Sequence, residues 1–206
     1  MVVSMQMAPN PQIPTAFPSC IGRGTLVDTY HGPIPVEDLV IGDKIMTKDD
    51  GFQPVKWLGN IAAEARGRHA PVRIAPGTLG NSRSLIVSQY QPLLVSDWRA
   101  ELLFGEREVL IPAHHLVNNE TIWVQEGGLI DYFMILFPRH QVFYTQDSFA
   151  SSFHPASPGL EMIGNDGQNR LRRALPALAN NWEAYGAPAR PILKSFEVRA
   201  MRAFGS

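Results

Sequence analysis

From Cys20 to about Phe153 the chain alternates between short strand-like stretches and turns. Each stretch is rich in β-branched and aromatic residues and ends at glycine, proline or a small polar residue. The stretches include TLVDTYHG, VRIAP, SLIVS, PLLVS, VLIPA, TIWVQ, DYFMILF and QVFYT. Many short strands with closely spaced turns are typical of an all-β architecture. We therefore expect a mainly β domain over residues 20–154.

One turn in this region has a specific signature. Asp50-Gly51 lies between two alternating runs, and an Asp-Gly pair in that setting favours a β-hairpin. We expect its strands at residues 44–47 and 53–58. Two other segments have no such signal: ELLFGE fits either a strand or one helical turn, and AHHLV fits a short helix.

The two ends of the chain differ from its centre. Residues 1–19 carry four prolines and no charged side chain, which predicts an extended arm. Residues 155–206 have apolar residues at helical spacing, which predicts a helical extension with at least two helices within 168–204. Pro191 stands where a first helical turn would begin. The residues that we expect to be buried against the β body are Leu171, Leu175, Leu178, Ile192 and Phe196.

Composition excludes several classes of site and partner. Eighteen basic and nineteen acidic residues give a net charge of −1, which would not attract nucleic acid. The longest apolar run, residues 132–137, is too short to span a membrane, and the N-terminal segment lacks the basic start of a secretory signal. We expect a cytoplasmic protein, or one exported without a signal peptide.

The cysteine and histidine patterns predict no metal ion and no cofactor. Cys20 is the only cysteine, which excludes an intramolecular disulfide and a CxxC metal site. His114 and His115 are adjacent, and neighbouring side chains are expected to point apart. We expect His31, His69 and His154 to be solvent-exposed or capping residues in turns, and Trp57 and Trp123 to be core aromatics.

The block around Cys20 resembles a known family. It contains Cys20, Gly24-Thr25, Thr29, VEDL at residues 36–39, Gly42-Asp43, Thr47 and QPVKW at residues 53–57. Later segments, including LIVSQYQPLLVS, YFMILFPRHQVFY and SFHP, look similar too. In this order they resemble the Hedgehog/intein (Hint) family, in its bacterial branch. The resemblance implies a horseshoe of β-hairpins in which the first cysteine attacks the peptide bond before it.

Applied to this chain, the resemblance implies a site made of Cys20, Ser88, Gln91 and His140. Cys20 would attack the carbonyl of Ser19, and the departing amine would need a proton from a general acid. The family places a histidine where this chain has Gln91, and an amide cannot transfer a proton at neutral pH.

Two further positions depart from the family pattern. Met134 stands where a polar residue is common, and Gln141 follows His140 where inteins carry an asparagine. Glutamine cyclises poorly compared with asparagine, so the resemblance does not extend to full splicing.

Three functions fit these residues. The first is a self-processing domain that cleaves its own N-terminal segment, its substrate in cis, at the Ser19–Cys20 bond. Its activity would be slow or degenerate. The second is an inactive scaffold of the same fold that binds an unidentified protein. The third is a cysteine protease acting in trans through Cys20 and His140, for which no third orienting residue can be assigned. A packed thiol and a histidine satisfied within a strand pair are the structural alternatives for these two residues.

Overall fold

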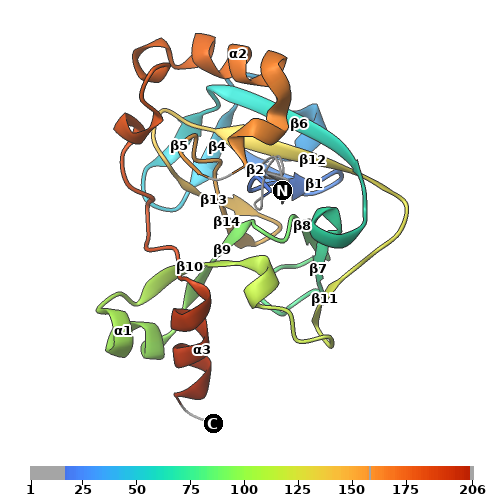
Figure 1. Ribbon diagram of the computed structural model, residues 1–206, viewed down its shortest axis with the longest axis vertical. Helices are drawn as coiled ribbons and strands as arrows, with labels where there is room; N and C mark the ends of the chain where they lie inside the picture. Colours follow the sequence, from blue (N-terminus) through green and yellow to red (C-terminus); the bar gives the residue numbers. More distant parts are fainter. Residues whose placement is uncertain (1–16, 158, 205–206) are drawn as a thin grey trace, which may run out of the picture.

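The computed structural model describes residues 17–157 and 159–204, and these residues form two antiparallel β-sheets with helical segments at either end (Figure 1). The smaller sheet has the strand order β11-β7-β8-β1-β12-β6, and the larger has the order β10-β9-β14-β13-β2-β4-β5, with β3 paired to β2. The strands of the smaller sheet are β1 (Ile21–Gly22), β6 (Trp57–Glu64), β7 (Val72–Ile74), β8 (Leu85–Val87), β11 (Ile122–Val124) and β12 (Leu129–Leu136). The larger sheet comprises β2 (Leu26–Thr29), β3 (Gly32–Pro35), β4 (Lys44–Thr47), β5 (Gly51–Pro54), β9 (Pro92–Ser96), β10 (Glu108–Pro112), β13 (Val142–Thr145) and β14 (Ser148–Ser151). The predicted mainly β fold is confirmed.

The Asp50-Gly51 hairpin is present, but its second strand is shorter than predicted. β4 pairs with β5, and β5 ends at Pro54. Val55 then bonds through both backbone groups to the turn at Gly42 and Asp43, and Lys56 donates to Leu136 O. The chain changes sheets at this point, so the predicted strand over 53–58 is split between β5 and β6.

Both segments without a clear signal are helical. ELLFGE lies mostly in α1 (Trp98–Phe104), where Asp97 caps the first turn and Gly105 ends the helix with φ 74°. AHHLV begins with the 3₁₀ turn η3 (Ala113–His115). A further 3₁₀ turn, η1 (Val36–Asp38), follows β3, and η2 (Gly67–His69) follows β6.

The C-terminal region contains two α-helices, as predicted. Its elements are η4 (Leu160–Ile163), α2 (Gly164–Ala174), η5 (Pro176–Leu178), η6 (Trp182–Tyr185) and α3 (Ser195–Ala203). Figure 1 shows α2 above β6 and β12, while α3 lies at the opposite end beside α1. Leu171 is fully buried, and Leu175 and Leu178 are partly buried against the same cluster.

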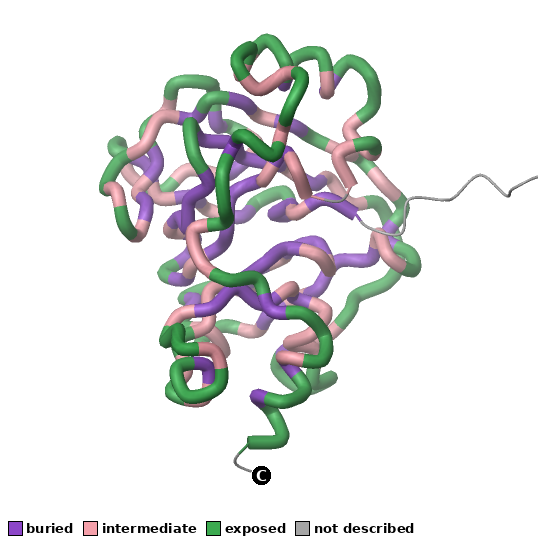
Figure 2. The backbone as a smooth tube through the Cα atoms, turned by 60° about the vertical axis from the view of Figure 1, so that its left-hand side comes forward, coloured by how far each residue is buried: buried purple, intermediate pink, exposed green. Residues whose placement is uncertain are grey.

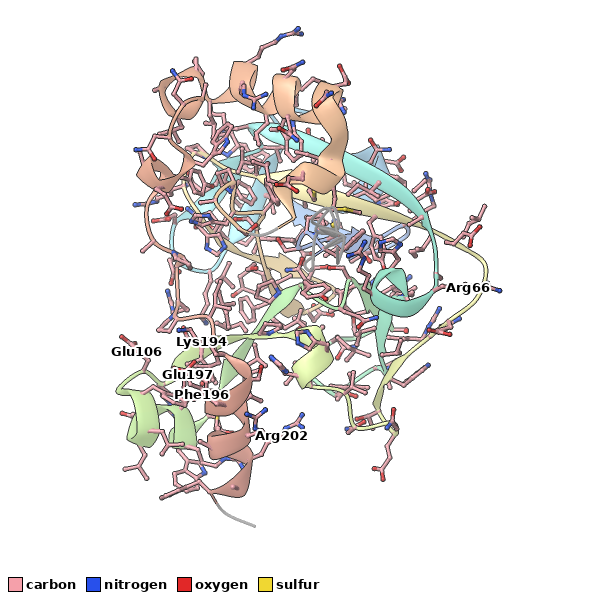
Figure 3. All side chains as sticks on the ribbon, in the orientation of Figure 1. Arg66, Glu106, Lys194, Phe196, Glu197 and Arg202 are labelled. Carbon is pink, nitrogen blue, oxygen red and sulfur yellow. The ribbon has the colours of Figure 1, made fainter. Side chains whose placement is uncertain are left out.

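The expected burial of Ile192 and Phe196 is wrong. Ile192 is 38% exposed and pairs with Leu110 in an extended bridge, because α3 begins only at Ser195 rather than near Pro191. With that start, α3 turns Val198 and Met201 inward. Phe196 is 59% exposed and lies near the start of α3 (Figure 3).

Buried residues concentrate at the centre of the molecule, between and along the two sheets (Figure 2). Trp57 is buried as predicted, whereas Trp123 is only partly buried because it lies on β11 at the edge of its sheet. Among the residues described, no helix has the length and apolar character needed to cross a membrane.

Candidate functional site

Cys20 lies immediately before β1, the short strand held between β8 and β12. Ser88 follows β8, and its backbone N–H donates to Cys20 O at 2.9 Å. The Ser88 hydroxyl accepts from Cys20 N–H at 3.2 Å and donates to Pro18 O at 2.9 Å. The Cys20 thiol also donates to Pro18 O, at 3.3 Å. Sheet pairing therefore brings Cys20 and Ser88 together across 68 residues of sequence.

The thiol of Cys20 has an apolar environment. Cys20 is 1% exposed, and its cluster contains Phe17, Trp57, Tyr132, Met134, Leu136 and Phe153. Burial raises the pKa of the Cys20 thiol well above its ordinary value. Burial also raises the pKa of Tyr132, and the nearby Cys20 charge adds to that shift. Because no cation in this cluster would stabilise a thiolate, the protonated thiol is the favoured form.

Gln91 lies one turn after Ser88, and its backbone N–H donates to Ser88 O. Its side-chain amide nitrogen donates to Ser151 O at 2.8 Å and to Pro92 O at 3.0 Å. These bonds tie the start of β9 to the end of β14. The amide donors are thus directed at backbone carbonyls, and the side chain has a structural role at this position.

His140 is buried just before β13, and its Nδ1 accepts a hydrogen bond from Ala189 N–H at 3.0 Å. This bond places the ring proton of the neutral imidazole on Nε2. Burial, reinforced by the charge of His154, lowers the pKa of His140 to about 4, against a smaller opposing effect of the Ser152 backbone. At neutral pH the ring is therefore uncharged.

A cavity of about 150 Å³ joins the upstream side of Cys20 to His140. Its walls come from both sheets and from the C-terminal region. The lining residues are Phe17, Ser19, Tyr90, Pro92, Pro112, His140, Ser151, Ser152, His154, Ser157 and Ile192. Ser19 and His140 thus share one cavity, whereas Cys20, Ser88 and Gln91 are not among its lining residues.

His154 bonds to the turn that follows it, as expected of a capping residue, but its place in the cavity beside His140 was not foreseen. Its ring lies 5.5 Å from that of His140 and lines the same cavity. Its Nε2 donates to Gly186 O at 2.8 Å, and its Nδ1 accepts from Ala156 N–H. The SFHP segment was the available signal, since it is one of the segments that carry the family resemblance.

The adjacent pair His114 and His115 does not point apart as expected. Their ring centroids are 3.8 Å apart, because both residues lie in the η3 turn rather than on a strand. His114 Nδ1 donates to Gln89 O at 2.8 Å. In the part of the chain that the structure describes, no three histidine, cysteine, aspartate or glutamate residues gather as metal ligands would.

Comparisons with known proteins place this arrangement in a family. The fold is similar to the solution structure of a bacterial intein-like domain from Clostridium thermocellum, at 12% identity and a TM-score of 0.46, covering 67% of this chain and 99% of that one. It is also similar to the gp41-1 intein (12%, TM-score 0.39, 64% and 97% covered) and to the Ssp DnaB mini-intein variant M86 (11%, 0.41, 66% and 95%). No curated protein matches the sequence. The family model of the Hint domain matches residues 19–157, more than half of the chain. The chain therefore belongs to the Hint domain family.

Proposed function

We propose that this Hint domain cleaves its own chain slowly at the Ser19–Cys20 peptide bond, with the segment before Cys20 as its substrate in cis. The observation that carries the proposal is the hydrogen bond from Cys20 N–H to the Ser88 hydroxyl. That nitrogen is the leaving group of the bond to be broken. A polar partner fixed on it, beside a thiol one residue from the reacting carbonyl, is the minimum arrangement for an acyl shift.

The first step forms a five-membered ring from Sγ, Cβ, Cα and N of Cys20 and the carbonyl carbon of Ser19. Cys20 Sγ loses its proton and bonds to the carbonyl carbon of Ser19, and the π electrons of the carbonyl move to oxygen. When the adduct collapses, the bond to Cys20 nitrogen breaks, and that nitrogen takes up a proton to become a free amine. Water or an added thiol then attacks the thioester and releases Cys20 as a thiol. The products are an upstream segment ending at Ser19 and a domain beginning at Cys20.

Ser88 acts in this scheme as a positioning residue. Its hydroxyl hydrogen is directed at Pro18 O, so its oxygen is free to accept the Cys20 N–H. The pair of bonds holds the two consecutive peptide units, Pro18–Ser19 and Ser19–Cys20, in a fixed relation to each other. Such preorganisation contributes to rate by holding the thiol near the carbonyl that it attacks.

Three features support a slow reaction. Burial raises the pKa of the Cys20 thiol, so little thiolate is present at neutral pH. The Gln91 amide has no acidic proton to give to the leaving nitrogen. His140, with a pKa lowered to about 4, is not an imidazolium at neutral pH. Losing general acid catalysis alone slows such a step about 10²–10⁴-fold.

An inactive scaffold is the second candidate, and the bonding of Gln91 favours it. A side chain whose donors are used on Ser151 and Pro92 stabilises the fold without serving a reaction. In this reading the buried thiol of Cys20 is a core residue.

Intact mass spectrometry of the full chain distinguishes the two candidates. The protein is incubated at neutral pH for days, with and without dithiothreitol, beside the Cys20→Ala variant. Release of a 1–19 segment by thiol from the wild type, and none from the variant, is the expected result. An intact wild-type chain under all these conditions would favour the scaffold.

A further inference from the structure

Phe17, three residues before Cys20, is anchored in the body of the domain. It is 1% exposed and belongs to the same apolar cluster as the thiol. Its ring centroid lies 5.1 Å from that of His69 and 5.3 Å from that of Tyr132, with the second contact edge to face. Tyr132 is held in place by the bond from its hydroxyl to His69 O at 2.9 Å. One wall of the pocket for the Phe17 ring, Tyr132, is therefore a side chain that is itself fixed.

The next residue is held through its backbone. Pro18 O accepts from both the Ser88 hydroxyl and the Cys20 thiol. Proline restricts φ and has no N–H, so this carbonyl is the only backbone hydrogen-bonding group that Pro18 must satisfy. Phe17 is thus held by burial of its side chain, and Pro18, the next residue, is held by hydrogen bonds to its carbonyl.

Gly159 also lies directly against this segment. A Cβ atom at Gly159 would lie 2.7 Å from Pro18 N and 2.9 Å from the carbonyl carbon of Phe17. Backbone therefore passes directly against backbone, and only glycine fits. Because Gly159 precedes η4 and α2, the C-terminal region supplies one wall of the enclosure around residues 17–19.

We propose that residues 17–19 occupy a recognition channel and that the channel selects a large apolar side chain three positions before Cys20. The occupant is the chain's own upstream segment, and Phe17 is its specificity-determining residue. The statement that the docked bond is the one that is cut rests on the proposed function, whereas the docking itself does not. A smaller residue at 17 would leave the space between His69 and Tyr132 empty and release the segment that covers the thiol.

The single cysteine makes docking measurable without any cleavage. Ellman's reagent reacts with Cys20 in the native full chain only when the segment opens. We expect Phe17→Ala to raise the labelling rate at least about 10-fold, because truncating a buried aromatic side chain strongly destabilises its docked state. Phe17→Leu, which keeps most of the apolar volume, should stay within about 3-fold of the wild type. Phe196→Ala, at an exposed phenylalanine, should leave the rate unchanged.

A second pair of variants keeps the test decisive if Phe17→Ala unfolds the domain. Gly159→Ala should raise the labelling rate, because its methyl group would collide with Pro18. Gly105→Ala is the matched control: Gly105 also has a left-handed backbone, and nothing lies within 4 Å of a Cβ placed there. Melting temperatures of all variants show which ones remain folded.

The possible results separate the two proposals. If folded Phe17→Ala and Gly159→Ala proteins label Cys20 no faster than their controls, the channel is refuted. If they label faster and the wild type is cut by thiol, Phe17→Ala should slow release at least 10-fold while Phe17→Leu does not. Equal release from both would overturn the selection of a large apolar residue. A wild type that is never cut counts against the proposed cleavage alone, because the labelling result still decides the docking.

Discussion

Replacing Gln91 with histidine should restore the missing proton donor at a measurable cost in stability. We expect an imidazolium at this position to protonate the departing Cys20 nitrogen, a step that the amide cannot perform. General acid catalysis contributes about 10²–10⁴-fold, and we expect the lower end, about 10²-fold faster thiol-induced release, because the thiol stays buried. A 10²-fold gain corresponds to about 2.7 kcal/mol of transition-state stabilisation.

The loss of stability follows from the hydrogen bonds of Gln91. Its amide satisfies Ser151 O and Pro92 O inside the protein, and an imidazole can replace at most one of these bonds. A buried carbonyl left without a donor costs about 1–3 kcal/mol. For a domain of this size, each kcal/mol lowers Tm by about 2–4 °C, so Gln91→His should melt roughly 2–12 °C below the wild type.

The assay follows release of the segment before Cys20 by intact mass, together with Tm by circular dichroism. Gln91→Leu is the matched control, because it loses the same hydrogen bonds and gains no acid. It should melt at least as low as Gln91→His and release nothing faster than the wild type. Equal release from the histidine and leucine variants would refute the missing-acid explanation, and an unchanged Tm in both would refute the structural role of the amide.

Other expected outcomes concern the nucleophile, the pH dependence and the C-terminal region. Cys20→Ala should abolish release in the wild-type and Gln91→His backgrounds alike, as followed by mass spectrometry; release from either would assign the reaction to another group. His140 has a folded pKa of about 4 against about 6.5 when unfolded, so the unfolded chain binds the extra proton and stability falls as pH drops from about 6.5 toward 4. The loss in the free energy of unfolding is of order 3 kcal/mol. When that free energy, measured by urea unfolding, is plotted against pH, its slope over this range should be shallower for His140→Gln than for the wild type. Leu171→Ala should destabilise the protein by about 2–5 kcal/mol, since that side chain is fully buried in the Cys20 cluster, whereas Phe196→Ala should change stability by less than about 0.5 kcal/mol. Equal losses from both in thermal unfolding would show that α2 does not pack as described.

Local patterns predicted the strands and the hairpin better than they predicted how the C-terminal region packs. Alternation and an Asp-Gly turn depend only on neighbouring residues, so the predicted bounds of β4 match those of the structure. The strand β3 was missed because Pro33 and Pro35 argue against a strand, although its pairing with β2 tolerates them at the sheet edge. Phe196 was misplaced because helical spacing does not say where α3 begins, and hence which face it turns inward.

Only those parts of the candidate site that lie within the recognised motifs could be predicted from the sequence. The block around Cys20 and the segment containing Ser88 predicted their meeting, which the sheet pairing explains. The hydrogen bonds of Gln91 to Ser151 and Pro92 depend on two strands that approach in three dimensions, and nothing in the local sequence encodes them. Gly159 was missed for the same reason: a close approach to Pro18 leaves no periodic signal.

The hydrogen bond from Ala189 to His140 has a consequence for the order of events during synthesis. The ribosome makes Cys20 before Ser88, the cavity wall at Ser151 and the segment that holds His140, which follow it over about 170 residues. At about 5–20 residues per second, that interval lasts roughly 10–30 s. During this time the nascent chain carries the junction without the surroundings that would make it reactive. Under the proposed function, cleavage would therefore wait for translation to pass residue 189, and a ribosome stalled before that residue would hold a chain whose junction is still intact.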